Sequence, residues 1–332
     1  MKRFLFLLVI FLVFPYSFAA SQALESQDLV SSGIEFVLYP QTASPNSNVQ
    51  AVLESTSVNL DTSNIAWLLN GKNIKSGLGI KEINFTTGPV GSQTTLEAII
   101  SNSGNNISKK ITIASSDIDI LWRGKGFIPP FYKGRTLWGA QTSITLMALP
   151  HVFNSNGKEI SNNNLIYKWI KDGFVLGNVS GVGKNSLSLS DSVLSMPINI
   201  EVQVSIDGNS VVATKNLSFI PKKQSILIYE NNPLYGLLFN KEINGLFSTT
   251  EKEFSFAAFP LFFSTTKKDS GNITYAWLLN GINSGSQSII TYRAPDNSPV
   301  SSNITLNVVS PLMVLQNVSR NFVAQFINEQ KI

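Results

Sequence analysis

The sequence contains no cysteine and a single histidine, His151. The lack of cysteine excludes disulfides, thiolate nucleophiles, cysteine-based zinc sites and a lipid anchor on cysteine. One histidine cannot build a histidine-based metal site, and a Ser-His-Asp triad would depend on it entirely. His151 follows Pro150 at the end of an expected strand, so we interpret it as a loop residue. We expect no enzyme activity and no cofactor.

Charge is also scarce, because Asp, Glu, Lys and Arg make up 14% of the residues. Basic residues occur as isolated pairs such as Lys109-Lys110 and Lys267-Lys268, which is typical of solvated turns. No basic run indicates binding to nucleic acid or to anionic lipid. Helical periodicity is absent beyond the N-terminus, whereas Asn, Ser, Thr, Ile, Val and Leu dominate, a mixture that favours half-buried strands.

Long apolar runs are absent except at the N-terminus. Lys2 and Arg3 precede an apolar stretch from Phe4 to Phe14, and small residues follow. This pattern predicts a signal peptide over 1–19, cleaved after Ala19. An uncleaved membrane anchor is the alternative, but the run is shorter than the ~20 residues of a spanning helix. Cleavage would leave 23 basic and 21 acidic residues, so the mature chain is nearly neutral.

A signal peptide on a chain without cysteine favours a bacterial exported protein, because secreted eukaryotic domains of this kind usually carry disulfides. We therefore expect a secreted or cell-envelope location. Membrane association is expected only if the N-terminal segment stays uncleaved.

One short pattern occurs three times: Ile65-Ala66-Trp67-Leu68-Leu69-Asn70-Gly71, Tyr167-Lys168-Trp169-Ile170-Lys171-Asp172-Gly173 and Tyr275-Ala276-Trp277-Leu278-Leu279-Asn280-Gly281. In each copy a Trp and a large residue two positions earlier share one face of an expected strand. The Asn-Gly or Asp-Gly that follows predicts a tight hairpin turn. The three Trp residues lie 102 and 108 residues apart, the size of one β-sandwich domain. We predict that each is the central residue of a separate core.

Alternating apolar and polar residues around each Trp predict further short strands. The fold class predicted is all-β, with three tandem immunoglobulin-like β-sandwiches after the signal peptide. The expected boundaries are a flexible leader over 20–32 and domains over 33–115, 116–223 and 224–332. The joints between domains are short and lack Gly/Ser-rich linkers, which predicts restricted freedom between neighbours.

The second and third repeats carry an insertion that the first lacks. Trp122 opens the second repeat where Tyr39 and Tyr229 open the others, but Trp122 lies 47 residues before its core Trp and Tyr39 lies only 28 before. The inserted segments are too apolar for free loops. They either cover sandwich edges and fill domain joints, or they contact a partner or a glycan. The candidate partner contacts are Phe127, Phe131, Tyr132, Trp138, Tyr235 and Phe239.

The Trp strands resemble bacterial immunoglobulin-like domains and especially PKD-type repeats, which show an aromatic, one residue, a Trp and then a Gly-containing turn. Tyr275-Ala276-Trp277 with Asn280-Gly281 fits that layout. The usual Gly-Asp-Gly of PKD repeats is missing from all three copies. The arrangement also looks like exported multi-repeat bacterial proteins. The resemblance implies a surface spacer, adhesion or assembly role, and it transfers no catalytic residue.

Two weaker patterns have ordinary structural explanations. Asp117 and Asp119, at the first domain joint, are possible Ca²⁺ ligands, but turn and joint chemistry explains them as well. Ser180-Gly181-Val182-Gly183-Lys184 lacks the spacing of a phosphate-binding loop, and Ser76-Gly77-Leu78-Gly79-Ile80 stands at the same place in the first repeat. We interpret both as one repeated structural turn.

These observations favour a non-enzymatic exported array that acts in interaction, adhesion or scaffolding, with a protein or glycan of the cell envelope as partner. One alternative is carbohydrate binding within a polysaccharide-active system. Another is an envelope-anchored component of a pilus or secretion apparatus. Exposed coplanar aromatics in the insertions would favour the glycan alternative.

Overall fold

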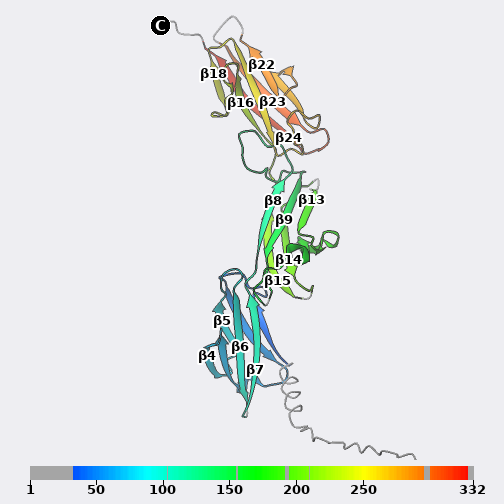
Figure 1. Ribbon diagram of the computed structural model, residues 1–332. Coiled ribbons are helices and arrows are strands. Elements are labelled where there is room, and N and C mark those ends of the chain that lie inside the picture. Colours follow the sequence, from blue (N-terminus) through cyan, green and yellow to red (C-terminus); the bar gives the residue numbers. More distant parts are fainter. Residues whose placement is uncertain are drawn as a thin grey trace, which may run out of the picture. The chain divides into compact units, whose positions relative to one another are not determined.

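A computed structural model describes residues 33–327 except 103, 155, 191–193, 209 and 295–299 (Figure 1). The predicted signal peptide and the leader therefore lie outside the described residues. The described chain forms six β-sheets, two for each sequence repeat. The predicted fold class, tandem immunoglobulin-like β-sandwiches, is confirmed.

The first sandwich packs a three-stranded sheet against a four-stranded sheet. Alternating buried and exposed residues along its strands place one face of each sheet in the core. The first sheet has the order β1 (Ile34–Tyr39), β2 (Asn48–Ser55), β5 (Glu82–Thr86). The second has the order β4 (Lys72–Leu78), β3 (Asn64–Leu69), β6 (Gln93–Asn102), β7 (Asn105–Ala114).

The second sandwich repeats this plan, with β8 as an edge strand of its first sheet. That sheet has the order β13 (Ser186–Ser190), β9 (Ser143–His151), β8 (Asp117–Gly124). The other sheet has the order β11 (Phe174–Val175), β10 (Ile166–Lys171), β14 (Ile198–Ser205), β15 (Val211–Phe219), and β12 (Gly181–Val182) also pairs with β10.

The third sandwich adds a parallel strand, β18, beside its last strand. Its first sheet has the order β17 (Gly236–Leu237), β16 (Ser225–Asn232), β19 (Glu253–Leu261), β22 (Ile289–Arg293). Its second has the order β18 (Leu246–Thr249), β24 (Asn317–Phe326), β23 (Val300–Val309), β20 (Thr274–Leu279), β21 (Ile282–Gly285).

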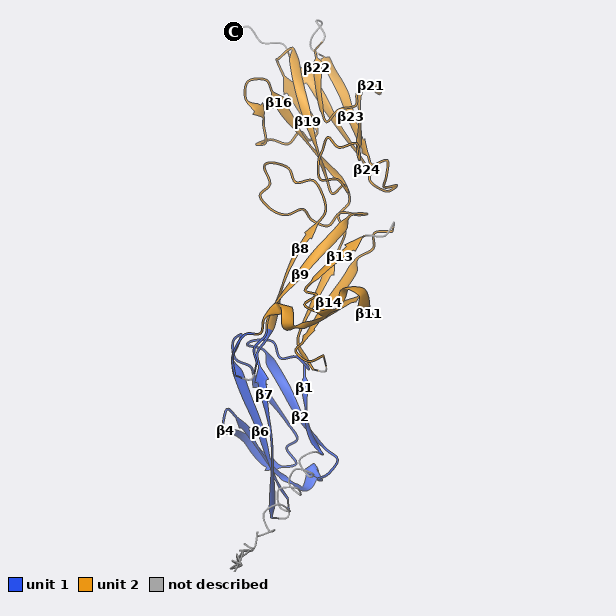
Figure 2. Cartoon of the chain, turned by 45° about the vertical axis from the view of Figure 1, so that its right-hand side comes forward, with its two compact units in different colours: residues 1–116, 152–159 blue, residues 117–151, 160–332 orange. Residues whose placement is uncertain are grey.

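The chain divides into two compact units, shown in two colours in Figure 2. Unit 1 holds the first sandwich together with residues 152–159, and unit 2 holds residues 117–151 and 160–332. Within unit 1, the Gln93 side-chain amide donates to the Asn154 carbonyl at 3.2 Å. The second and third sandwiches share unit 2, so contacts between them belong to one body.

Each core is centred on its Trp. Trp67, Trp169 and Trp277 are completely buried, and each indole N–H donates to a backbone carbonyl. The acceptors are Ile80 at 2.8 Å, Lys184 at 2.9 Å and Gln287 at 2.8 Å. A buried indole N–H that lacked an acceptor would cost about 1–3 kcal/mol, so these bonds fix where each Trp lies.

The predicted hairpin turns have the same geometry in all three repeats. Asn70, Asp172 and Asn280 have φ of 51°, 50° and 49°, and the glycine after each has φ near 80°. Two consecutive positive φ values are what a type I′ turn requires. Each turn side chain also accepts a backbone N–H from the start of a neighbouring strand at 2.8 Å, as Asn280 does from Asn303.

The two glycine-rich segments that follow Trp67 and Trp169 form one repeated turn, as the sequence predicts. Gly79 and Gly183 have φ of 66° and 68°, and their N–H groups donate to the Ser63 and Leu165 carbonyls. An added Cβ would lie 3.2 Å from the backbone oxygen of Asp61 or Asn163, so glycine suits both positions.

The sequence comparison that matched Trp122 with Tyr39 and Tyr229 at the start of each repeat was wrong. Pro150 pairs with Ile118, and the equivalent Pro260 pairs with Ile226, so Trp122 corresponds to Glu230 and not to Tyr229. Trp122 packs edge-to-face on Phe219, with ring centroids 5.3 Å apart. Tyr39 is half exposed on the other face of its strand. A one-residue offset changes the face of a strand because side chains alternate.

Candidate functional site: a cationic concavity beside β8

The insertion of the second repeat leaves β8 at Gly124 and returns alongside it. The Gly124 N–H donates to the Thr136 carbonyl at 3.0 Å. A Cβ at Gly124 would come within 2.3 Å of the Leu137 oxygen, so only glycine permits this approach. The Trp138 indole then donates to the Thr142 carbonyl at 3.1 Å and closes the loop. The insertion is therefore an ordered part of unit 2.

One side of the insertion packs on the third sandwich. Phe131 lies 5.4 Å from Tyr229, 4.8 Å from Phe239 and 5.9 Å from Phe259, measured between ring centroids. Phe127 lies 6.3 Å from Phe259. These rings form an apolar cluster with buried Ala257 on the outer face of β16 and β19. Burial raises the pKa of the Tyr229 hydroxyl, and the nearby Glu242 carboxylate raises it further.

The structure divides the six predicted partner contacts. Trp138 is only 3% exposed, so the partner prediction is wrong for this residue: its ring fills the fold and its N–H is bonded internally. Phe127 and Phe239 are half-buried in the aromatic cluster, where they contact this chain's own rings. Phe131 is 37% exposed at the rim of the same cluster.

Tyr132 and Tyr235 are the most exposed of the six, at 48% and 78%. The Tyr132 ring folds over Gly134, where an added Cβ would meet it at 2.3 Å. The rings of the cluster meet mostly at steep angles, as Phe131 and Tyr229 do at 69°. The packed rings of this cluster therefore offer no coplanar platform of the kind that stacks on sugar rings.

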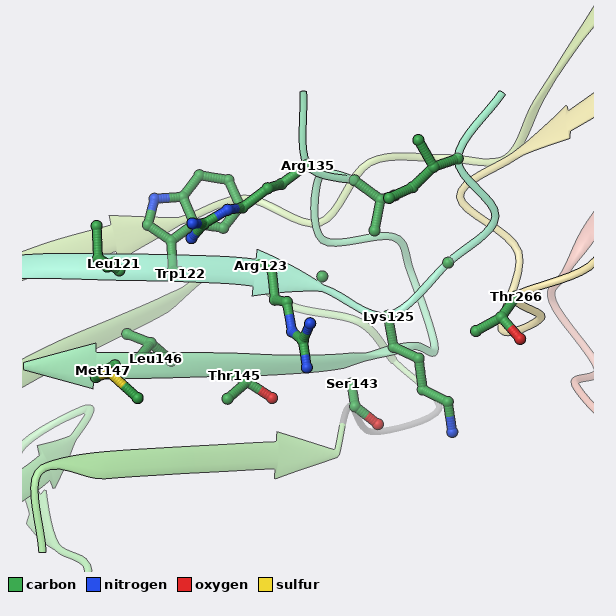
Figure 3. A pocket seen from close by; sticks show the side chains of 14 residues that line it. Leu121, Trp122, Arg123, Lys125, Arg135, Ser143, Thr145, Leu146, Met147 and Thr266 are labelled. Carbon is green, nitrogen blue, oxygen red and sulfur yellow. The ribbon is translucent and has the colours of Figure 1, made fainter. Parts of the chain in front are cut away.

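The other side of the insertion borders a concavity of about 840 Å³. Its floor is the outer face and open edge of β8 with neighbouring residues of β9, and Ile128, Arg135 and Thr136 of the insertion form one wall. Thr266 of the third sandwich lies at one end. Figure 3 shows Arg123 and Lys125 extending to one side of β8, and Arg135 of the insertion lying on the other side of that strand, near Trp122; all three line the concavity.

The charge of this concavity has one sign. Arg123, Lys125 and Arg135 line it, and no Asp or Glu does. All three side chains are exposed. Throughout the described ranges, the ion pairs that form do not involve these three cations. Leu121 and Met147, each 42% exposed, add apolar surface between the charges. The surface thus suits an anionic ligand with an apolar component.

The two aspartates proposed as calcium ligands are engaged otherwise. Asp117 accepts from Lys215 at 3.3 Å and from the N–H of Ile118, and Asp119 lies 3.7 Å from the His151 ring. Among the described residues, no three His, Cys, Asp or Glu side chains come close enough to hold one metal ion. Geometry gives the calcium prediction no support.

The cationic cluster was missed by sequence reasoning. Arg123 and Lys125 lie ten or more residues before Arg135. Only the return of the insertion, fixed by the Gly124–Thr136 hydrogen bond, brings them together. The available signal was the presence of Lys125, Lys133 and Arg135 among the apolar residues of the insertion.

The sheets define the class of the protein: the described part of the chain is a tandem array of immunoglobulin-like β-sandwich domains. No helix within the described ranges combines the length and the apolar character needed to cross a membrane. A scan against protein-family models gives no match, and a search of curated proteins gives none either.

The solved structures that resemble this chain include several domain arrays. The central fibronectin-III array of RIM-binding protein is 10% identical with a TM-score of 0.30, over 89% of this chain and 96% of that one. Three N-terminal domains of the bacteriophage RB49 highly immunogenic outer capsid protein are 9% identical with a TM-score of 0.26, over 89% and 99%. The fibronectin(III)-like modules of Clostridium thermocellum CbhA are 12% identical with a TM-score of 0.26, over 57% and 95%. Similarity at this level carries no argument about ligand or partner.

Proposed function

We propose that this chain is an exported, non-enzymatic array of the bacterial envelope that binds a protein partner in an adhesion or scaffolding role. The observation that supports it most is the cationic concavity of unit 2, where Arg123, Lys125 and Arg135 face solvent without a carboxylate. Three uncompensated charges on an otherwise weakly charged chain favour an external counter-charge.

The perturbed titratable groups favour a binding role over catalysis. In the described part of the chain, shifted pKa values belong to Tyr167, Tyr229, Tyr275 and Tyr292, and burial raises each. Tyr167 and Tyr275 donate to backbone carbonyls at 3.1 and 2.7 Å. None of the four lines the concavity. The hydroxyls of Tyr167 and Tyr275 therefore anchor their cores.

The arrangement of aromatic side chains supports a protein partner over a glycan. Four of the six candidate aromatics, Phe127, Phe131, Trp138 and Phe239, pack within the chain, and the concavity is lined by Trp122 alone among aromatics. Glycan recognition through stacking needs open ring faces, and Trp122 uses its ring on Phe219.

The test immobilises the full mature chain and exposes it to solubilised envelope fractions. We expect saturable retention of a protein that is lost after the fraction is treated with protease. Retention that survives protease and disappears after polysaccharide digestion would overturn the proposal. N-terminal sequencing of the exported protein should give a start near Ala20, whereas an intact Met1 would support the anchored alternative.

A further inference from the structure

The edge of β8 is open over a defined stretch. In an antiparallel pair, alternate residues direct N–H and C=O toward the partner strand and away from it. The Gly124 N–H points away from β9, toward Thr136, whereas the Lys125 N–H donates to Ser143 on the β9 side. Ile120 and Trp122 lie four and two residues before Gly124 in the same strand. Because alternate residues point the same way, their N–H and C=O groups also face away from β9.

The third sandwich shows what this edge accepts. Pro150 pairs with Ile118, and Pro260 pairs with Ile226. Counting along β8 and β16 from these pairs, Ile120 and Trp122 correspond to Ile228 and Glu230. The Ile228 carbonyl accepts from the Ile243 N–H at 2.8 Å, and the Glu230 carbonyl accepts from the Leu238 N–H at 2.9 Å. The third repeat thus covers its own edge. In the second repeat, within the described residues, the outward backbone groups of Ile120 and Trp122 receive no such cover.

The outer face beside this edge shows the same contrast. Tyr229 and Ala257 of the third sandwich are buried beneath rings that include Phe127 and Phe131. The equivalent residues of the second sandwich, Leu121 and Met147, are 42% exposed and line the concavity. The first repeat lacks the insertion that would supply such rings.

We infer that the β8 edge binds an extended acidic peptide segment of a partner protein as an added strand. This inference rests on the proposed function and names the chemistry of its partner. Main-chain hydrogen bonds to Ile120 and Trp122 would hold the segment. Its acidic side chains would lie on the outer face of the sheet, beside Arg123, Lys125 and Arg135, and its apolar side chains would lie on the opposite face of the added strand. A second copy of this insertion is disfavoured because it carries Lys125, Lys133 and Arg135 into a surface that is already cationic.

The probe is a fluorescent peptide of alternating Glu and Val, about as long as β8, titrated into the full chain at low salt. A peptide of alternating Lys and Val has the opposite charge and tests whether binding requires acidic side chains. A third peptide has the same Glu and Val sequence, but the backbone nitrogens that would face β8 are methylated. This peptide keeps the charge but cannot donate hydrogen bonds to β8 as an added strand. We expect binding of the first peptide only. Equal binding of the methylated peptide would show simple charge attraction and overturn the strand assignment.

Variants locate the site. Arg135→Glu should weaken the peptide affinity about tenfold, because one repelled charge replaces an attracted one. Lys168→Glu is the matched control: Lys168 is an exposed cation of the same sandwich on β10, outside the concavity, and its replacement should leave the affinity within about twofold.

Three further results would overturn the inference: no peptide binding, equal losses in both variants, and binding of an acidic oligosaccharide such as oligogalacturonate in place of the peptide. If the envelope protein is still retained while Arg135→Glu has no effect on peptide binding, the inference fails and the proposed function stands.

Discussion

At the scale of residues, the three Trp side chains fill a core and bind a carbonyl at the same time. Trp277→Ala should lower the free energy of unfolding of its sandwich by about 3–5 kcal/mol, since a large buried ring is lost. Chemical denaturation followed by fluorescence measures this loss. Ile282→Ala, which truncates a side chain that is 75% exposed in the same sandwich, is the control and should change little. A Trp277→Ala protein as stable as the parent would contradict this account of the core.

The raised pKa of Tyr167 predicts that the free energy of unfolding falls at alkaline pH. Burial raises the pKa of its hydroxyl from 10.0 to about 12. The folded state therefore holds the proton more tightly than the unfolded chain does. Its contribution to stability is complete below pH 10 and is lost as the pH rises from 10 to about 12.

Melting temperatures across that range test this prediction. Tyr167→Phe should flatten the decline relative to the parent, although its Tm at pH 8 falls because the bond to Asn162 is lost. Tyr132→Phe, at an exposed ring, should follow the parent curve. A Tyr167→Phe curve parallel to the parent would rule out this tyrosine as the source.

At the scale of elements, the hairpins were predictable from sequence and the insertion was not. Asn70-Gly71 and its two counterparts determine a local turn, because two adjacent positive φ values restrict the residue types allowed. The path of the insertion depends on distant partners, such as the Thr136 carbonyl for Gly124 and Phe259 for Phe131. The aromatics themselves indicated that the segment was packed, but the cluster of cations on its other side had no local pattern.

Phe131 is the residue on which attachment of the insertion should depend. Phe131→Ala removes three ring contacts, and we expect a loss of about 1–3 kcal/mol from that attachment. Trypsin should then cut faster after Lys133 and Arg135, both exposed, as mass spectrometry of limited digests would show. Tyr132→Ala changes a neighbouring half-exposed ring outside the cluster and serves as the control. Equal cleavage rates in the two variants would contradict the role of Phe131.

At the scale of the whole molecule, the side-chain amides of Gln316 and Gln224 join two sandwiches within unit 2. Gln316 is completely buried; its side chain donates to the Ala140 carbonyl at 2.8 Å and accepts from the Ser264 N–H at 3.0 Å. Gln224 donates to the same Ala140 carbonyl at 2.9 Å and to the Phe262 carbonyl at 3.1 Å. Sequence could not indicate this network, because Gln residues in turns carry no pattern that predicts their partners.

This network predicts coupled unfolding. Calorimetry of the full chain should show the second and third sandwiches melting in one transition. Gln316→Leu, which leaves the Ser264 N–H without its acceptor, should cost about 1–3 kcal/mol and split that transition. Gln287→Leu replaces an exposed side chain and should preserve it. Separate transitions already in the parent would contradict the coupling.

The open edge of β8 is the central claim, and amide hydrogen exchange at single-residue resolution tests it most directly. Saturating Glu and Val peptide should slow exchange at Ile120 and Trp122, whose N–H groups face away from β9, and should leave Leu121 and Arg123, which bond to β9, unchanged. Unchanged exchange at Ile120 and Trp122 while the peptide is bound would contradict strand addition at this edge.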